Sequence, residues 1–383
     1  MQISSFKSAH TLITGQGCSS TLIEHINKLK FNYPLLVTDK GVRKSGTLEH
    51  IIPQLDGMSY SIFDNVNAEP DNEVVEQCFE VFKRQAHDAI ISVGGGSAID
   101  IAKCVAVLAG NSQSLNAMFG ENKVASRGIP HIAIPTTAGT GSEVTNIAIL
   151  AVPSEQTKKG VVSDYLLPDV AIVAPEMTVS CPPHITAASG VDALVHAIEA
   201  YLSKFASPIT DALAIKAMGM IMTHLPTAYG TPQDLNAREN MATASLMAGL
   251  AFGNAGVGAV HALAYPLGGR YHISHGVSNA LMLPYVMQWN KSACLDRFAD
   301  IATALSTPIS TEDDGDTVAA KVIQQLHDLC TKVGIPKGMK SLGVKYEDIP
   351  ELAKEAIKVE RLLKNNPRNL SQSDIESIYY AAY

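Results

Sequence analysis

The first half of the chain alternates short β-rich segments with helical patterns, and this alternation constrains the fold more than any other feature. The β-rich segments are PLLVTD at 34–39, DAIISVGGGS at 88–97, HIAIP at 131–135 and VAIVAP at 170–175, and a helical pattern occupies 71–85. Strands separated by helices form parallel sheets with helices on their faces. The sequence therefore predicts an α/β domain that binds its ligands at the carboxyl ends of its strands.

The pattern changes at residues 180–183, where SCPP interrupts it. Beyond this point Ala, Met and Leu recur at helical spacing, and Ser371 with Asp374 before an apolar run predicts a capped terminal helix. A chain of 383 residues, 46% of them hydrophobic, is long enough for two cores. We predict an α/β domain over residues 1–180 and an all-helical domain over residues 181–383.

Composition narrows the class of function. A formal net charge of -8 argues against a nucleic-acid binder, which needs a concentrated basic surface, and favours a small-molecule substrate. The six cysteines lie far apart with no CxxC pair, as is typical of reduced thiols in the cytoplasm. The sequence has neither a recognisable targeting segment nor a long uninterrupted apolar run. We expect a cytoplasmic protein that binds neither nucleic acid nor a membrane.

Two loops rich in small residues follow predicted strands. Gly94, Gly95 and Gly96 precede Ser97, which opens the helical segment AIDIAKCVAVLA, so bare backbone N–H groups and a helix N-terminus coincide. A pyrophosphate binds well at such a point, although a tight turn without a ligand has the same sequence. A second loop at 136–142 adds hydroxyl groups. Two such loops in one sheet favour a dinucleotide cofactor.

Asp39 ends the segment LLVTD. A carboxylate at a strand end can accept hydrogen bonds from the adenosine ribose and repel a 2′-phosphate, which favours NAD over NADP. The alternative is a helix-cap or turn aspartate. A competing fingerprint begins at Gly15 and Gly17, with Asp39 about 20 residues on, but its third glycine position holds Ser20.

The segment GVDALVHAIEAYL indicates a metal site. Asp192 and His196 are four residues apart and share one face of a helix, with Glu199 on the same stripe. A divalent cation would compensate this polar stripe on an otherwise apolar helix. A solvated or hydrogen-bonded helix face is the simpler alternative.

Further histidines lie downstream in GAVHALAYPLGGRYHISHG, at His261, His272 and His275. Asp192 with three imidazoles makes a four-ligand set that suits Fe(II) or Zn(II). Such a site would keep one net positive charge, so an alcohol that coordinates and ionises to an alkoxide would neutralise it. Alkoxide formation would then drive hydride transfer from the carbinol carbon to the nicotinamide.

Across nearly its whole length, the chain resembles the iron-dependent (group III) alcohol dehydrogenases. This family includes lactaldehyde and 1,3-propanediol oxidoreductases and bacterial iron ethanol dehydrogenases. The shared motifs are VTD at Asp39, ISVGGGSAIDIAK, PTTAGTGSEVTN, LLPDVAIVAPEMT, ASGVDALVHAIEAY, HALAYPLGGRYHISHG and NPR at 366–368. The resemblance implies a dehydroquinate synthase-like fold, with a dinucleotide-binding α/β domain followed by an all-helical metal-binding domain. It also implies a homodimer that reversibly oxidises a small primary alcohol or diol to an aldehyde with NAD.

The same resemblance assigns roles to individual residues. The implied metal ligands are Asp192, His196, His261 and His275. The implied cofactor-binding residues are Asp39, Asn67, Gly95, Gly96, Ser97, Thr136, Thr137, Thr140, Asn146 and Lys158. Phe252 matches a position beside the substrate pocket.

One position departs from the pattern of many relatives, which carry a histidine where this chain has Tyr265. A phenol can donate and accept a hydrogen bond but normally ionises far above neutrality, so we expect proton release through His272, a water or the cofactor ribose, and keep Tyr265 as a second candidate catalytic residue. Rival functions are a glycerol dehydrogenase-like zinc polyol dehydrogenase, a dehydroquinate synthase-like lyase and a non-catalytic nucleotide-binding protein. The two enzymes are expected to use three protein ligands, and the synthase a basic cleft. The ligand segments here are nearly free of basic residues apart from Arg270.

Overall fold

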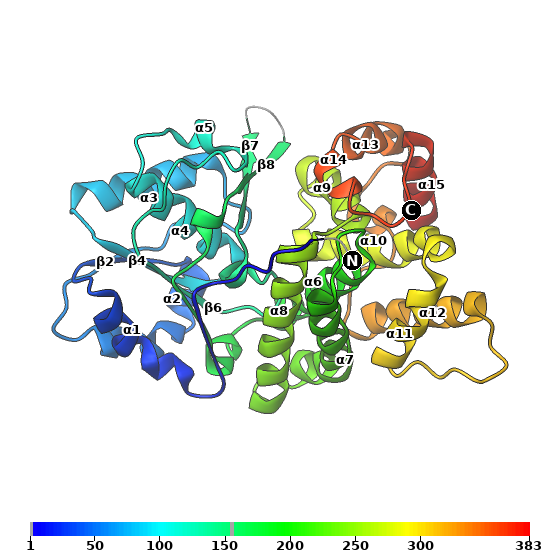
Figure 1. Ribbon diagram of the computed structural model, residues 1–383, viewed down its shortest axis with the longest axis horizontal. Coiled ribbons are helices and arrows are strands. Elements are labelled where there is room, and N and C mark those ends of the chain that lie inside the picture. Colours follow the sequence, from blue (N-terminus) through cyan, green and yellow to red (C-terminus); the bar gives the residue numbers. More distant parts are fainter. Residues whose placement is uncertain (1–2, 154–156) are drawn as a thin grey trace. The chain divides into compact units, whose positions relative to one another are not determined.

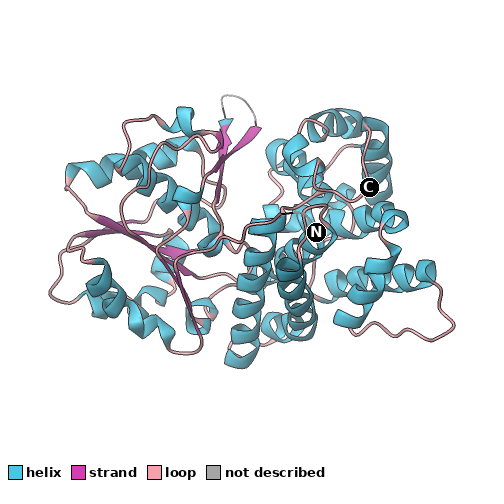
Figure 2. Cartoon of the chain, viewed as in Figure 1, coloured by secondary structure: helices cyan, strands magenta, loops and turns pink. Residues whose placement is uncertain are grey.

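The computed structural model describes residues 3–153 and 157–383, which group into two compact units. One unit, called the α/β unit below, comprises 6–182 and 232–246, and the helical unit consists mainly of 183–231 and 247–383. Among the described residues, all strands lie in the α/β unit (Figures 1 and 2). An α/β part followed by a helical part confirms the predicted fold class.

The main sheet of the α/β unit has six strands among the described residues, in the order β1-β9-β6-β4-β2-β3. Every pairing in this sheet is parallel. The strands are β1 (Thr11–Thr14), β2 (Pro34–Val37), β3 (Ser61–Phe63), β4 (Ala89–Gly94), β6 (His131–Pro135) and β9 (Val170–Val173). Because β4 lies between β2 and β6, the loops that follow these three strands emerge side by side at one edge of the sheet.

Side chains of the central strands alternate between two apolar cores. Leu35 and Val37 of β2 lie in a cluster with Val75 of α3 (Asn72–Arg84) and with residues of α4 (Gly96–Ala109). Leu36 lies in the opposite cluster with Ile26 of α1 (Leu22–Leu29). Helices therefore cover both faces, and full burial of each such aliphatic side chain contributes about 1.5–3 kcal/mol.

The remaining elements of the α/β unit are short. A second sheet, of order β5-β8-β7, pairs β7 and β8 antiparallel. The bounds are α2 (Lys40–Lys44), α5 (Leu115–Met118), β5 (Gly120–Glu121), β7 (Ile147–Val152) and β8 (Thr157–Val162). The Asp71 side chain caps α3 by accepting a 2.9 Å hydrogen bond from the Val74 amide.

The helical unit is built around α6, whose residues from Val191 to Leu202 are buried. Its helices are α6 (Pro183–Leu202), α7 (Pro208–Gly230), the second half of α8 (Leu235–Ala255), α9 (Ala259–Tyr271), α10 (His275–Asn290), α11 (Leu295–Ala304), α12 (Gly315–Lys332), α13 (Ile349–Ala356), α14 (Glu360–Leu363) and α15 (Gln372–Ala382). The Ser371 and Asp374 side chains form a capping box at the start of α15, which confirms the predicted terminal helix.

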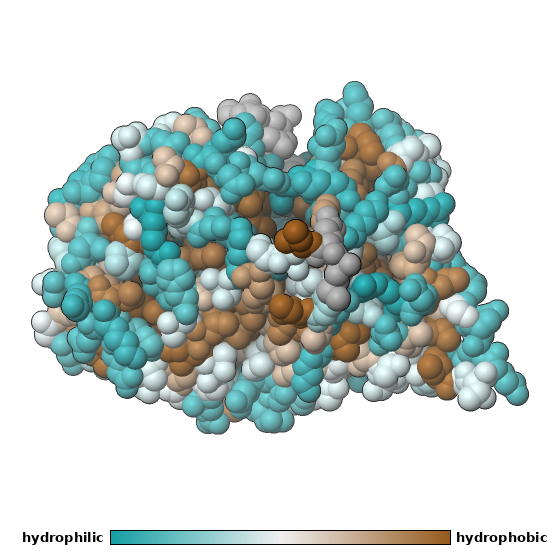
Figure 3. Space-filling model, in the orientation of Figure 1, coloured by the Kyte–Doolittle hydropathy of each residue, from teal (hydrophilic) through white to brown (hydrophobic). Residues whose placement is uncertain are grey.

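No single helix in the described ranges passes the length and hydropathy test for a membrane span, although the bent pair α8 and α9 passes it jointly. On the face drawn in Figure 3, hydrophilic and apolar side chains are interspersed.

Candidate active site

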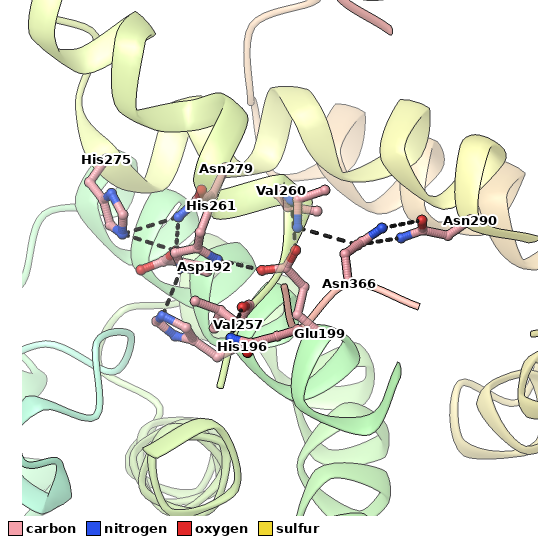
Figure 4. A network of polar contacts seen from close by, with 12 residues as sticks. Asp192, His196, Glu199, Val257, Val260, His261, His275, Asn279, Asn290 and Asn366 are labelled. Carbon is pink, nitrogen blue, oxygen red and sulfur yellow. Dashed lines mark hydrogen bonds and ion pairs between the residues drawn. The ribbon is translucent and has the colours of Figure 1, made fainter. Parts of the chain in front are cut away.

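Three helices bring four candidate ligands together in the helical unit. Asp192 and His196 lie one turn apart on α6, His261 lies in the first turn of α9, and His275 is the first residue of α10. One ligand atom from each residue can be chosen so that all four lie within 4.8 Å of one another (Figure 4). Residues separated by up to 83 positions in sequence thus point to one place.

The distances between these atoms suit a small divalent cation. The Nε2 atoms of His261 and His196 are 3.0 Å apart, and Asp192 Oδ1 lies 3.8 Å from His261 Nε2 and 3.9 Å from His275 Nε2. Metal–ligand bonds of about 2.1 Å in tetrahedral geometry place ligand atoms about 3.4 Å apart. The donor set, with one oxygen and three nitrogens, fits Fe(II) or Zn(II).

Burial sets the electrostatics of this cluster. Asp192, His196 and His261 are 2%, 4% and 3% exposed, whereas His275 is half-buried. Burial raises the pKa of the Asp192 carboxyl, but attraction to the three imidazoles and a 2.6 Å hydrogen bond from Asn279 Nδ2 outweigh burial and hold the pKa below its ordinary value. Asp192 is therefore a carboxylate, the form that binds cations.

Of the three other predicted site residues, two lie beside the cluster. The Phe252 ring stacks on His196 with centroids 4.1 Å apart, and the Tyr265 ring lies 6.4 Å from that of His275. His272 is exposed, ends α9 in a left-handed conformation with φ 53°, and is not part of the four-residue cluster. The structure thus brings Phe252 and Tyr265 beside the candidate ligands and leaves His272 at a helix end.

The predicted cofactor residues meet at the carboxyl edge of the main sheet. Asp39 follows β2, Gly95 and Gly96 follow β4, and Thr136 and Thr137 follow β6. The Thr136 amide donates a 3.0 Å hydrogen bond to the Gly94 carbonyl and joins the two later loops. Gly95 precedes α4 and has no side chain with which to cap it, so the helix N-terminus can bind an anion.

Close approach of these loops explains why glycine is required. A Cβ atom added at Gly96 would lie 2.7 Å from Oγ1 of Thr140, and one added at Gly95 would lie 3.4 Å from Oγ1 of Thr137. The backbone N–H groups and the threonine hydroxyls therefore share a narrow space. This arrangement fits a pyrophosphate, which is bound by backbone donors and small polar groups.

Asp39 also caps a helix. Its Oδ1 atom accepts a 2.9 Å hydrogen bond from the Val42 amide at the start of α2, as the simpler interpretation expected. Its Oδ2 atom would lie 3.7 Å from a Cβ atom at Gly94, so the second oxygen lies beside the glycine loop. A cap and a ribose contact can therefore be made by different oxygens of one carboxylate.

The remaining predicted cofactor residues have the following partners. The Ser97 hydroxyl donates a 2.6 Å hydrogen bond to the Ala68 carbonyl, and Asn146 Nδ2 donates to Asp164 at 3.0 Å. Lys158 pairs with Glu69 at 3.1 Å, and Asn67 is exposed. All four side chains lie in the α/β unit, but Ser97, Asn146 and Lys158 already have partners within the protein.

In the competing glycine fingerprint near Gly15, a glutamate side chain accepts the hydrogen bonds that a phosphate would need. The Gly17 amide and the Ser19 hydroxyl donate to the Glu176 carboxylate, at 3.1 Å and 2.6 Å. A carboxylate bound to these donors would repel a pyrophosphate. The loop after β4 is therefore the better candidate for a phosphate site.

Sequence reasoning missed a buried cation beneath the cofactor loops. Lys103 of α4 is fully buried, and its Nζ donates to Ser142 at 3.1 Å, to Thr145 at 3.2 Å and to the Ile147 carbonyl at 2.8 Å. Asp100 accepts from Ser142, and burial lowers the pKa of Lys103 to about 8. The signal in the sequence was an Asp and a Lys three residues apart on an otherwise apolar helix.

Two family descriptions match successive parts of the chain. Residues 9–175 match "Iron-containing alcohol dehydrogenase", and residues 186–383 match "Fe-containing alcohol dehydrogenase family, C-terminal". The chain belongs to the iron-containing alcohol dehydrogenase family. The resemblance indicated by the sequence motifs is thereby confirmed.

Relatives within this family match over nearly their whole length. The chain is 43% identical to long-chain-alcohol dehydrogenase 1 of Geobacillus thermodenitrificans over 375 residues, covering 96% of this chain and 94% of the relative. It is 38% identical to NAD-dependent methanol dehydrogenase of Bacillus methanolicus, covering 96% of each. A solved 1,3-propanediol oxidoreductase superposes with a TM-score of 0.97 at 38% identity, covering 100% of both chains. The chain is therefore an oxidoreductase of the alcohol dehydrogenase class.

Proposed function

We propose that this alcohol dehydrogenase reversibly oxidises a small primary alcohol or diol to an aldehyde, with NAD as hydride acceptor and Fe(II) as resident metal, a site that Zn(II) also suits. The observation that carries the proposal is the convergence of Asp192, His196, His261 and His275 on one point. A set of four ligands favours this function over the glycerol dehydrogenase-like and dehydroquinate synthase-like alternatives, because those enzymes are expected to use three protein ligands.

Each site residue has its own role in the proposed reaction. When bound, a divalent cation acidifies the alcohol oxygen and NAD accepts the hydride. The Asp192 carboxylate would limit the net charge of the metal site, and the three imidazoles would hold the cation in place. Phe252 covers one face of His196 and keeps water from it. Tyr265, whose ring centroid lies 6.4 Å from that of His275, is a candidate catalytic side chain beside the cluster.

In the α/β unit, we assign the pyrophosphate to the backbone of Gly95 and Gly96 at the start of α4, with Thr140 beside it. Asp39 would accept hydrogen bonds from the adenosine ribose. Asn67, Ser97, Asn146 and Lys158 remain predicted contacts of the cofactor. Lys103 donates hydrogen bonds to Ser142 of the second loop and to Thr145, and we assign it no contact with the cofactor.

The proposal also covers the cell compartment and the oligomeric state of the enzyme. All six cysteines are buried thiols that form no disulfide, and all lie among the described residues, which supports a reducing compartment such as the cytoplasm. We also retain the homodimer as a prediction from the family resemblance.

Metal removal tests the function directly. Protein purified without oxygen should contain iron or zinc, and it should consume NADH when a short aldehyde is added. A chelator should abolish turnover, and Fe(II) or Zn(II) should restore it. The measurement is NADH absorbance across short alcohols, diols and aldehydes, combined with elemental analysis. Full turnover by demonstrably metal-free protein would refute the proposal.

Replacing Asp39 with glycine tests the cofactor assignment. Loss of the carboxylate removes repulsion of a 2′-phosphate, so the kcat/KM ratio of NADP to NAD should rise by at least about 10-fold. The lost helix cap should cost only a few tenths of a kcal/mol, because glycine is tolerated at that position. Asp71→Gly is the matched control, since Asp71 caps α3 through the same 2.9 Å hydrogen bond. An unchanged ratio in Asp39→Gly would make Asp39 a cap residue alone.

A further inference from the structure

Glu199 is a buried carboxylate that contacts the metal cluster without belonging to it. It lies on α6, three residues after His196, and is 4% exposed. Its Oε2 atom lies 2.6 Å from Nδ1 of His261, and its Oε1 atom accepts a 2.6 Å hydrogen bond from the Val260 amide (Figure 4). Each oxygen of this carboxylate therefore serves a different donor on α9.

The first contact decides which nitrogen of His261 carries the proton. A carboxylate oxygen accepts hydrogen bonds, so Nδ1 of His261 is the protonated nitrogen. The lone pair then belongs to Nε2, the atom that lies 3.0 Å from His196 Nε2 and 3.8 Å from Asp192 Oδ1. The contact with Glu199 thus directs the metal-binding nitrogen into the cluster.

The second contact holds the end of α9 that carries His261. Gly258 precedes this helix and has no side chain to cap it. The Val260 amide donates to Glu199, and the Ala259 amide donates to Oδ1 of Asn366 at 3.3 Å. The first turn of α9 is therefore capped by side chains from distant parts of the chain.

Asn366 belongs to the late NPR motif and is not one of the four candidate ligands. Its side chain exchanges hydrogen bonds of 2.9 Å and 2.8 Å with Asn290 of α10, and it also donates to the Arg368 carbonyl. Asn366 accepts a hydrogen bond at the same helix end as Glu199, but it is Glu199 that bonds to the His261 ring. Replacing each of the two residues in turn therefore separates the effect of helix capping from the effect of imidazole orientation.

We propose that Glu199 is a positioning residue that fixes the tautomer and location of His261 for metal binding. The inference rests on the proposed function, because it assumes that His261 is a ligand. Outer carboxylates that hold a ligating histidine typically strengthen metal affinity by about 10–100-fold. Glu199 would do so here while also capping the helix that presents the ligand.

Glu199→Gln tests this proposal with little change in shape. Glutamine has one acceptor oxygen, whereas the Val260 amide and the His261 Nδ1–H group are two donors, so one of them must face an NH2 group. Zn(II) affinity, measured by competition with a chelator in the absence of NAD and substrate, should fall about 10–100-fold. Asn366→Ala is the control: it should lower the melting temperature of the metal-free protein and change Zn(II) affinity less than about 3-fold, since outer-shell loss is what weakens binding.

The outcomes separate the two proposals. Wild-type Zn(II) affinity in Glu199→Gln, or an equal loss in both variants, would overturn the positioning role. A wild-type protein that binds no metal would instead overturn the proposed function. Should Glu199→Gln fail to fold, the assigned ¹⁵N spectrum of the His261 ring in Zn(II)-loaded wild-type protein gives the answer. A protonated Nδ1 with metal on Nε2 supports the proposal, and metal on Nδ1 overturns it.

Discussion

Replacing His261 with alanine is expected to remove both bound metal and catalytic turnover. His261 lies at the centre of the cluster, with its Nε2 atom 3.0 Å from His196 and 3.8 Å from Asp192. Loss of an outer partner of a ligand typically costs about 10–100-fold, so loss of the ligand itself should lower kcat by at least about 10³-fold. The measurements are metal content per chain and the rate of NADH consumption with a short aldehyde.

The same variant should lose stability. Glu199 would keep its hydrogen bond from the Val260 amide and lose the one from His261, which leaves a buried carboxylate oxygen without a donor. Such a loss costs about 1–3 kcal/mol. His224→Ala is a suitable control because His224 is a half-buried histidine on α7 in the same unit and outside the cluster. Normal metal content in His261→Ala would remove His261 from the ligand set.

Gly276→Ala is expected to disrupt the metal site without touching any ligand. Gly276 follows His275 on α10, and a Cβ atom there would lie 2.5 Å from the Ala188 carbonyl oxygen and 2.8 Å from the Ala188 carbonyl carbon. These are backbone atoms of α6, so no side-chain rotation can relieve the clash. The start of α10 must move away from α6, and His275 must move with it, away from Asp192.

A displacement of this kind matters because a metal site tolerates shifts of only about 0.5 Å. We expect Zn(II) affinity and turnover to fall at least about 10-fold, with the fall measured by chelator competition and by steady-state kinetics. Gly315→Ala is the matched control: Gly315 also opens a helix, but its added Cβ would lie 3.6 Å from Leu295 Cβ, an ordinary contact. Unchanged affinity in Gly276→Ala would mean that α10 can shift without moving His275.

The strand-end positions of the cofactor residues could be predicted from the sequence. Asp39, Gly95 and Thr136 each follow a β-rich run, and ligands of parallel sheets gather where strands end. That β4 lies between β2 and β6 was not predictable from local patterns, because strand order depends on crossovers through space. Lys103 was missed because a buried lysine requires partners from a separate loop, which no local pattern reveals.

In the helical unit, too, some features of the site could be predicted from the sequence and others could not. The spacing of Asp192 and His196 predicted a shared face, and their placement in one cluster agrees with it. The residue pattern did not distinguish His272 from His275, whereas the family resemblance selected His275. The structure gives a physical reason: His272 terminates α9, and His275 begins the next helix. The segment 232–246, which groups with the α/β unit, carries no such signal in its sequence.

Burial of the thiols has a consequence for how this enzyme would respond to air. Burial raises the pKa of Cys18 and Cys330 to about 12 and that of Cys294 to about 11, so these groups are scarcely thiolate at neutral pH and react slowly with oxidants. Ferrous iron, the metal of the proposed function, would then be the oxygen-sensitive component. Aerobic inactivation should accordingly be reversed by exchanging the metal, and thiol reductants should restore little.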